Sequence, residues 1–291
     1  AFAAVIPAAC YQPTLPSVLT KDLPPPPECS ALWARVYQSH TSVTGNDAQD
    51  FTARLSGGAA GYERKLDPFS LLGGAFSYGR TDVNVSNTDN LHIDSYRSAL
   101  YGQRQYGAYF IGGYVSGAFN QAGATGTTSQ IKSYEYGGGA VINRRTPFGA
   151  GAIEPFVAID YDRVRQNAFN GVDNGNAFAV DAVTFDTLRS RLGATYIIPW
   201  YLTYGHIVRL EPQAAWVHDY LSTTPTLTAF SFAAGTMISG TGATVGRDAA
   251  FGGLTATTEL LPHIDFSLRY AGEFRLNQIT NSWFAQIKLR W

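Results

Sequence analysis

Apolar and polar residues alternate with a period of two through long stretches of this chain. One stretch carries apolar or small residues at every second position and mostly charged residues between them. Its apolar face consists of Ile264, Phe266, Leu268, Tyr270, Gly272 and Phe274. The final residues, 283–291, repeat the pattern and end on Trp291. Because successive side chains of a β-strand point to opposite faces, the pattern predicts strands with one apolar and one polar face.

The same alternation, bounded by turn residues, predicts twelve strands. They are expected at 31–43, 50–64, 70–85, 91–104, 107–121, 130–144, 150–165, 182–198, 203–220, 247–261, 263–276 and 280–291. Short turns follow the even-numbered strands, whereas longer and more polar connections follow the odd-numbered strands. The longest connections, 166–181 and 221–246, are interpreted as loops, with a helix as the lesser alternative for the second. The connection at 276–279 is short and departs from this trend.

Long loops at one end and short turns at the other are typical of outer-membrane barrels. A soluble β-sandwich or lipocalin-like barrel is the alternative, but it gives no reason to sort connections by length. Charged residues make up 15% of the chain, below the quarter or so typical of soluble domains. Lipid offers the backbone no hydrogen bonds, so the sheet must close on itself. We therefore predict an all-β fold, a 12-stranded antiparallel transmembrane β-barrel of the bacterial outer membrane, with both termini of the barrel domain on the periplasmic side.

Residues 1–30 differ in character from the barrel expected at 31–291. Their prolines favour extended backbone over a long helix. The segment also contains the two cysteines of the chain, Cys10 and Cys29. In an oxidising compartment we expect these cysteines to form a disulfide, and two unrelated thiols are the alternative. Whether the chain begins after a removed signal peptide or inside a longer protein stays open.

Several fragments, taken in their order along the chain, resemble the C-terminal β-barrel domain of autotransporters, the type V secretion proteins. They are LWARVY, LLGGAFSYGRTDVNV, EPFVAIDY, EPQAAWVHDY, GRDAAFGGLTATTEL, SLRYAGEF and the closing aromatic strand. The resemblance covers about residues 32–291. It implies a translocator barrel in the outer membrane of a Gram-negative bacterium, which exports or anchors an upstream passenger in cis at the cell surface.

The resemblance also implies partners and a role for each end of the chain. Outer-membrane lipids and the barrel assembly machinery are the expected partners. The final strand resembles an assembly signal with interface aromatics, comprising Trp283, Ile287, Leu289 and Trp291. The segment before the first strand is expected to fill the lumen, although its prolines and cysteines depart from the helix that is common in the family. A passenger-less barrel, acting as a small-solute pore or a structural component, is the alternative function.

Charged residues on the polar faces of the strands are expected to line the lumen. They are Glu154, Asp160, Asp162, Arg189, Arg191, Arg209, Glu211, Asp265, Arg269, Glu273, Lys288 and Arg290. Their mixed signs predict cross-strand ion pairs that stiffen the wall. Such a wall is either a hydrated surface for a passing polypeptide or simple solvation of the lumen.

Enzymatic activity is not expected. Asp160 and Asp162 form an acidic pair, and His218-Asp219 resembles a feature of outer-membrane proteases, but alternation sends His218 and Asp219 to opposite faces. Loops 166–181 and 221–246 are the lesser alternative for a surface hydrolase. The histidines show no metal-ligand spacing, and no cofactor motif is present. The net charge of −1 indicates no nucleic-acid partner.

Overall fold

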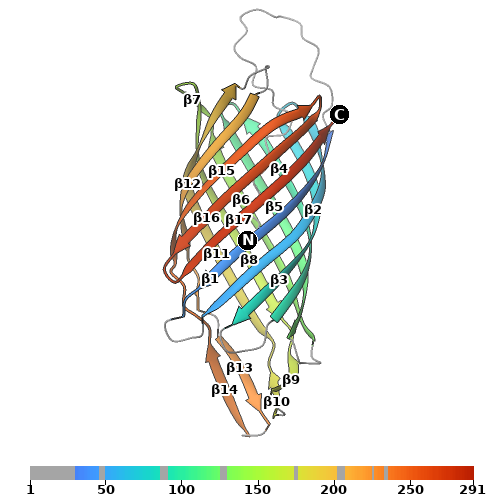
Figure 1. The fold of residues 1–291 in the computed structure, drawn as a ribbon, viewed down its shortest axis with the longest axis vertical. Coiled ribbons are helices and arrows are strands. Elements are labelled where there is room, and N and C mark those ends of the chain that lie inside the picture. The colour runs from blue at the N-terminus through green and yellow to red at the C-terminus, as the bar shows by residue number, and fades with distance from the viewer. Residues whose placement is uncertain are drawn as a thin grey trace, which may run out of the picture.

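The computed structural model forms one closed β-barrel with a small sheet at one end (Figure 1). The described residues are 30–45, 50–85, 91–124, 130–173, 176–201, 207–224, 226–232 and 235–291. The main sheet contains thirteen strands, of which the three-residue β7 (Thr146–Phe148) pairs only with one neighbour. The other twelve strands make the barrel wall, which confirms the predicted fold.

The wall strands are tilted against the barrel axis and each runs antiparallel to its neighbours (Figure 1). They are β1 (Ser30–Val43), β2 (Phe51–Asp67), β3 (Ser70–Val85), β4 (Leu91–Tyr106), β5 (Tyr109–Ala124), β6 (Gln130–Arg144), β8 (Gly151–Gln166), β11 (Val183–Tyr201), β12 (Ile207–Asp219), β15 (Asp248–Leu261), β16 (Ile264–Arg275) and β17 (Gln278–Arg290). These bounds lie within a few residues of the twelve predicted strands.

The first and last strands close the barrel. β1 pairs with β17 along its length, with Val36 opposite Ala285 in the register. At the end of this seam the Ser30 amide donates to the Trp291 carbonyl oxygen at 2.8 Å, and the Trp291 amide donates back at 2.9 Å. This pairing lets the barrel close, because an unpaired strand edge in hydrocarbon would leave polar backbone groups without partners.

Apolar side chains cover the outside of the barrel, and polar or small side chains point inward. On β16 the outward Leu268 is 51% exposed, whereas its neighbour Arg269 points inward to a hydrogen bond with Gln213. Outward residues of the other strands are similarly exposed, including Val36, Phe76, Leu100 and Val115. This arrangement inverts that of a soluble barrel and fits a wall surrounded by lipid. The described residues include no helix long and apolar enough to span a membrane.

The two ends of the barrel differ. We call one the short-turn end, because two-residue turns such as Gly107-Ala108 connect strands there and the C-terminus lies beside them (Figure 1). Gly107 has a positive φ of 59°, which suits a residue without a Cβ atom. We call the other the long-loop end, where longer connections leave the wall. The exception is the turn at Leu276-Asn277, in which Asn277 adopts a φ of 64°.

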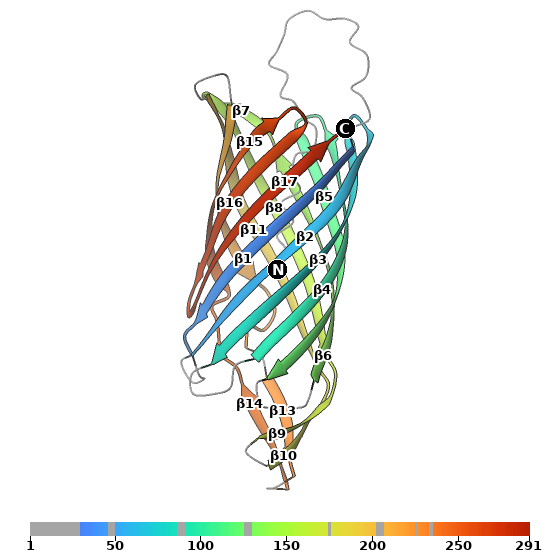
Figure 2. The same ribbon diagram turned by 45° about the vertical axis from the view of Figure 1, so that its right-hand side comes forward.

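The two longest connections are not plain loops, which corrects the expectation for 166–181 and 221–246. They contain β9 (Phe169–Asp173), β10 (Asn176–Val180), β13 (Thr226–Ser231) and β14 (Thr236–Thr241), which form a four-stranded sheet beyond the long-loop end (Figure 2). β10 joins the two hairpins by pairing with β13. Thr and Gly are frequent in these segments, and no sustained alternation marks a strand in them.

The predictions for residues 1–29 lie outside the described residues. They concern the separate N-terminal segment, its role as a lumen plug, and the disulfide between Cys10 and Cys29.

Candidate functional site

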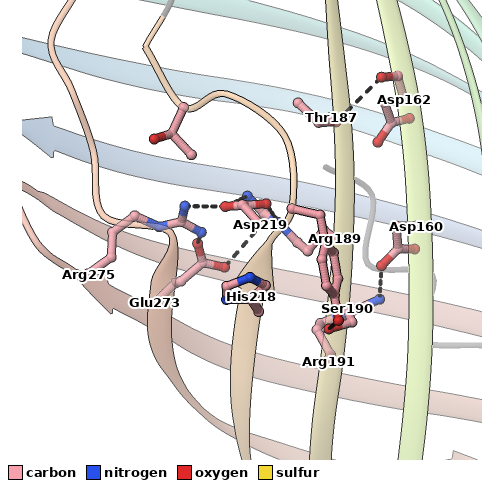
Figure 3. Close-up of polar contacts among 12 residues, drawn as sticks. Asp160, Asp162, Thr187, Arg189, Ser190, Arg191, His218, Asp219, Glu273 and Arg275 are labelled. Carbon is pink, nitrogen blue, oxygen red and sulfur yellow. Dashed lines mark hydrogen bonds and ion pairs between the residues drawn. The ribbon is translucent and has the colours of Figure 1, made fainter.

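The polar interior of the barrel is the candidate functional site, and its densest charge cluster lies toward the long-loop end. We define this mouth cluster as Arg189, Asp219, Glu273 and Arg275, from β11, β12 and β16 (Figure 3). Arg189 Nε donates to Asp219 Oδ1 at 2.8 Å and lies 3.5 Å from Glu273 Oε2 through Nη1. Arg275 pairs with both carboxylates, and its side chain is only 2% exposed.

The mouth cluster also holds the base of the connection between β12 and β15. Arg275 Nη1 donates to the Gly246 carbonyl oxygen at 3.2 Å, and the Asp219 amide donates to the Arg247 carbonyl oxygen at 2.9 Å. Two cations and two carboxylates balance one another. Their bonds therefore fix where the longest connection leaves the wall.

A second cluster on β8 and β11 contains the predicted acidic pair (Figure 3). Asp160 accepts from Arg191 Nη2 at 2.8 Å and from the Tyr114 hydroxyl at 2.9 Å. Asp162 lies over Gly137 on the neighbouring strand, where a Cβ atom would clash with its carboxylate. Asp160 lies over Gly139 in the same way, so what distinguishes Asp160 is its ion pair with Arg191.

A third cluster braces the seam between β1 and β17 from inside. The Trp33 indole donates to the Tyr101 hydroxyl at 2.8 Å, and Tyr101 donates to Glu63 at 3.2 Å. Glu63 is 1% exposed and forms an ion pair with Lys288 of β17. This closing cluster, defined as Trp33, Glu63, Tyr101 and Lys288, links β17 to β2 and β1 to β4 in addition to the backbone pairing of the seam.

Two further inward arginines bind amide oxygens instead of carboxylates. Arg35 donates to Gln286 Oε1 through Nε at 2.9 Å and through Nη2 at 2.6 Å. Arg269 donates to Gln213 Oε1 at 3.1 Å. Both guanidinium groups are thus held by neutral acceptors.

The remaining predicted lumen residues pair near the short-turn end. Arg290 Nη2 lies 2.9 Å from both Asp265 and Glu259, and Arg209 lies 2.5 Å from Glu211. Glu154 pairs with Arg145 and accepts from Asn143 at 3.2 Å. All twelve predicted lumen residues thus lie at inward positions of the register.

The residues predicted for assembly and the interface lie on the outward face of the last strand. They are Trp283, Ile287, Leu289 and Trp291, all of them exposed. Trp291 is 54% exposed, with its ring 6.3 Å from that of Tyr62. Amphipathic rings at a barrel end suit the boundary between hydrocarbon and headgroups.

His218 and Asp219, the dipeptide considered for a hydrolase, lie on opposite faces of β12. His218 lies on the outward side with Trp216, and its Nδ1 atom is 2.8 Å from Asp248, whereas Asp219 points inward. Within the same residues no three His, Cys, Asp or Glu side chains are placed to hold a metal ion. The geometry provides a charge-balanced polar wall, along which an extended chain meets hydrogen-bonding groups.

Sequence reasoning missed several partners of the predicted lumen residues. Glu63, Asp219 and Arg275 were not among the predicted lumen residues, although they occupy the most buried ion pairs. Small residues on both faces of β2 hide the inward direction of Glu63. For Asp219 and Arg275 the signal was present, because strict alternation along β12 and β16 already assigns them to the inward face.

Comparison with known proteins gives a consistent picture. The family model described as the autotransporter β-domain matches residues 32–271. The chain resembles the translocator domain of the autotransporter NalP from Neisseria meningitidis with a TM-score of 0.72 and 16% identity, over 90% of this chain and 88% of that one. It resembles the β-domain of the Bordetella autotransporter BrkA with a TM-score of 0.65 and 15% identity, over 89% and 98% of the two chains. At such identities these structures establish the fold.

Among curated proteins, an extracellular serine protease of Serratia marcescens is 26% identical over 208 residues. That alignment covers 65% of this chain, and the chain spans only 19% of the length of that relative. The family match covers most of the chain, and the closed 12-stranded wall agrees with it. The chain therefore belongs to the autotransporter β-domain family and is an outer-membrane translocator barrel.

Proposed function

We propose that this barrel brings a passenger polypeptide, joined in cis ahead of Ala1, to the surface of a Gram-negative cell. Topology is the observation that supports the proposal. β1 begins at Ser30, at the short-turn end, next to the last residue of the chain. If that end faces the periplasm, as short turns do in outer-membrane barrels, a surface-exposed passenger must be connected to β1 through the barrel interior.

The length of the N-terminal segment is compatible with this path. Extended backbone covers about 3.3 Å per residue, and the hydrocarbon core is about 30 Å thick. The 29 residues ahead of β1 are therefore more than sufficient to cross it. The inward clusters suit such a path, because paired charges offer hydrogen bonds along the wall without one dominant charge that would trap the passing chain.

Two partners follow from the same proposal. Lipid would surround the apolar outer face, and the barrel assembly machinery would insert the chain, using the last strand and its outward Ile287, Leu289 and Trp291. We also propose that the barrel itself is not an enzyme. The ion pair of Asp160 with Arg191 and the outward position of His218 support this view.

The test is an epitope placed directly before Ala1, behind a signal sequence for export to the periplasm. We expect antibodies and added protease to reach the epitope on intact cells that contain a folded barrel. As a control, replacing Ile287 and Leu289 with Asp should prevent insertion and leave the epitope inaccessible. An epitope that stays protected while the barrel is folded would contradict export and favour the passenger-less alternative.

A further inference from the structure

The outward face of β6 and β8 changes character in a regular order toward the long-loop end. Along β8, alternate outward residues are apolar, then aromatic, then basic: Ile159, Tyr161, Arg163 and Arg165. Along β6 the exposed outward series ends in Tyr136, Tyr134 and Lys132. Aromatic residues of barrels mark the boundary between hydrocarbon and headgroups. The basic residues therefore lie just outside the hydrocarbon, at headgroup level.

The basic side chains are neighbours on the barrel surface. Arg165 is opposite Tyr134 and Arg163 is opposite Tyr136 in the register of the two strands. The Asn167 amide donates to the Lys132 carbonyl oxygen at 2.9 Å, which places Lys132 and Arg165 diagonally across the pair, within reach of one another. We call Lys132, Arg163 and Arg165 the basic rim.

The basic rim carries uncompensated charge. Arg163 forms a two-pronged ion pair with Asp186 of β11, at 2.5 and 2.9 Å. No carboxylate among the described residues lies within ion-pairing distance of Lys132 or Arg165, both of which are exposed. Three cations against one carboxylate leave a local charge of +2.

On another sector of the outer barrel surface, also toward the long-loop end, the positive and negative charges balance. On β2, β3 and β4 the outward positions toward the long-loop end carry Arg54, Arg80, Asp82 and Asp94. Arg54 lies opposite Asp82, and Arg80 lies 3.4 Å from Asp82. The sector on β6 and β8 thus differs in charge from the sector on β2, β3 and β4.

We propose that the basic rim binds the phosphate groups of a phosphorylated glycolipid of the outer leaflet. A phosphate monoester carries a charge between −1 and −2 and three acceptor oxygens. The planar guanidinium of Arg165 can donate two parallel hydrogen bonds to such a phosphate, and the ammonium of Lys132 contributes a compact positive charge. The tyrosines below supply a surface for the first carbons of the acyl chains. The proposal rests on the proposed orientation, in which the long-loop end faces outward.

The test uses the purified full chain, folded in detergent, and bisphosphorylated lipid A as the probe in native mass spectrometry. We expect the wild type to retain lipid A, and the double variant Lys132→Gln, Arg165→Gln to bind it roughly 30-fold more weakly. The matched control, Arg54→Gln with Arg80→Gln, removes two rim cations from the balanced sector and should leave the affinity unchanged. Exchange of the two residues, Lys132→Arg with Arg165→Lys, should preserve binding.

Two further measurements identify which chemical group of the lipid is bound. Fully dephosphorylated lipid A should bind as weakly to the wild type as lipid A binds to the double variant, and millimolar inorganic phosphate should not displace lipid A. Equal retention by the wild type and the double variant, both shown to be folded by heat-modifiable gel migration, would overturn the proposal, as would displacement by inorganic phosphate. Binding in detergent requires no export, so failure here leaves the translocation proposal untouched.

Discussion

Arg275 shows how strongly a single lumen residue can be constrained. Its guanidinium lies between two carboxylates, Asp219 and Glu273, and also reaches the Gly246 carbonyl oxygen. Removal of one partner from a buried ion pair is costly, because the opposite charges stay buried without compensation. Ion pairs in water, by contrast, contribute little to the free energy of folding.

We predict that Arg275→Gln lowers the free energy of unfolding by about 3 kcal/mol, measured by urea titration in lipid vesicles. The control is Arg80→Gln on the outer rim, where Arg80 is 49% exposed beside Asp82. The Arg80→Gln substitution should lower the free energy of unfolding by less than about 1 kcal/mol. Equal effects of the two substitutions would show that the mouth cluster is solvated like the surface.

At the residue scale, the sequence reveals to which face a side chain points, but seldom which residue it pairs with. Alternation places Arg189 and Glu273 inward from the sequence alone, but it does not show that the two pair with each other, because β11 and β16 are distant along the chain. Lys288 meets Glu63 across more than two hundred residues, and only the closed register brings them together. A pattern with a period of two carries no information about that register.

At the scale of elements, the wall strands and the small sheet differ in how they are stabilised. Each wall strand pairs on both sides. The strands β9 and β14 have a partner on one side only, within the described residues, and the contact between the two hairpins is the three-residue pairing of β10 with β13. An isolated two-stranded hairpin is marginally stable in water, so each hairpin depends on the other.

We predict that replacement of residues 169–180 by a short Gly-Ser linker leaves the barrel folded but loosens the remaining hairpin, 226–241. Limited proteolysis should then cut within 226–241 much faster than in the wild type, while the wall persists as a heat-modifiable band. An unchanged cutting rate would mean that the second hairpin is stable without β10. Loss of the heat-modifiable band would mean that the small sheet supports the wall.

The wall strands and the small sheet also differ in how well the sequence predicts them. The wall strands were predictable because one face meets hydrocarbon and the other meets polar groups, which imposes alternation on strands such as β16. β13 and β14 lie beyond the barrel wall, where neither face is held to that rule, so residues 226–241 resemble a loop rich in Thr and Gly. Their pairing with the other hairpin arises only from the folded arrangement.

At the scale of the whole molecule, closure explains most other features. The absence of hydrogen bonds in lipid requires the first strand to meet the last, and the interior clusters then reinforce that contact through Trp33 and Lys288. The same requirement accounts for the two backbone hydrogen bonds between Trp291 and Ser30 at the end of the seam. The number of strands and the need to close were predictable, whereas the exact register of the seam was not.

Closure is tested most directly by a cross-link across the seam. In a chain with Cys10→Ser and Cys29→Ser, cysteines replace Val36 and Ala285, which lie opposite each other on β1 and β17. Directly opposed residues are close enough for a disulfide. We predict efficient intramolecular oxidation in the membrane for this pair, and none for Val36→Cys with Leu289→Cys, which lies four residues away along β17. No cross-link in the opposed pair, or a cross-link only between different molecules, would contradict a barrel closed by these two strands.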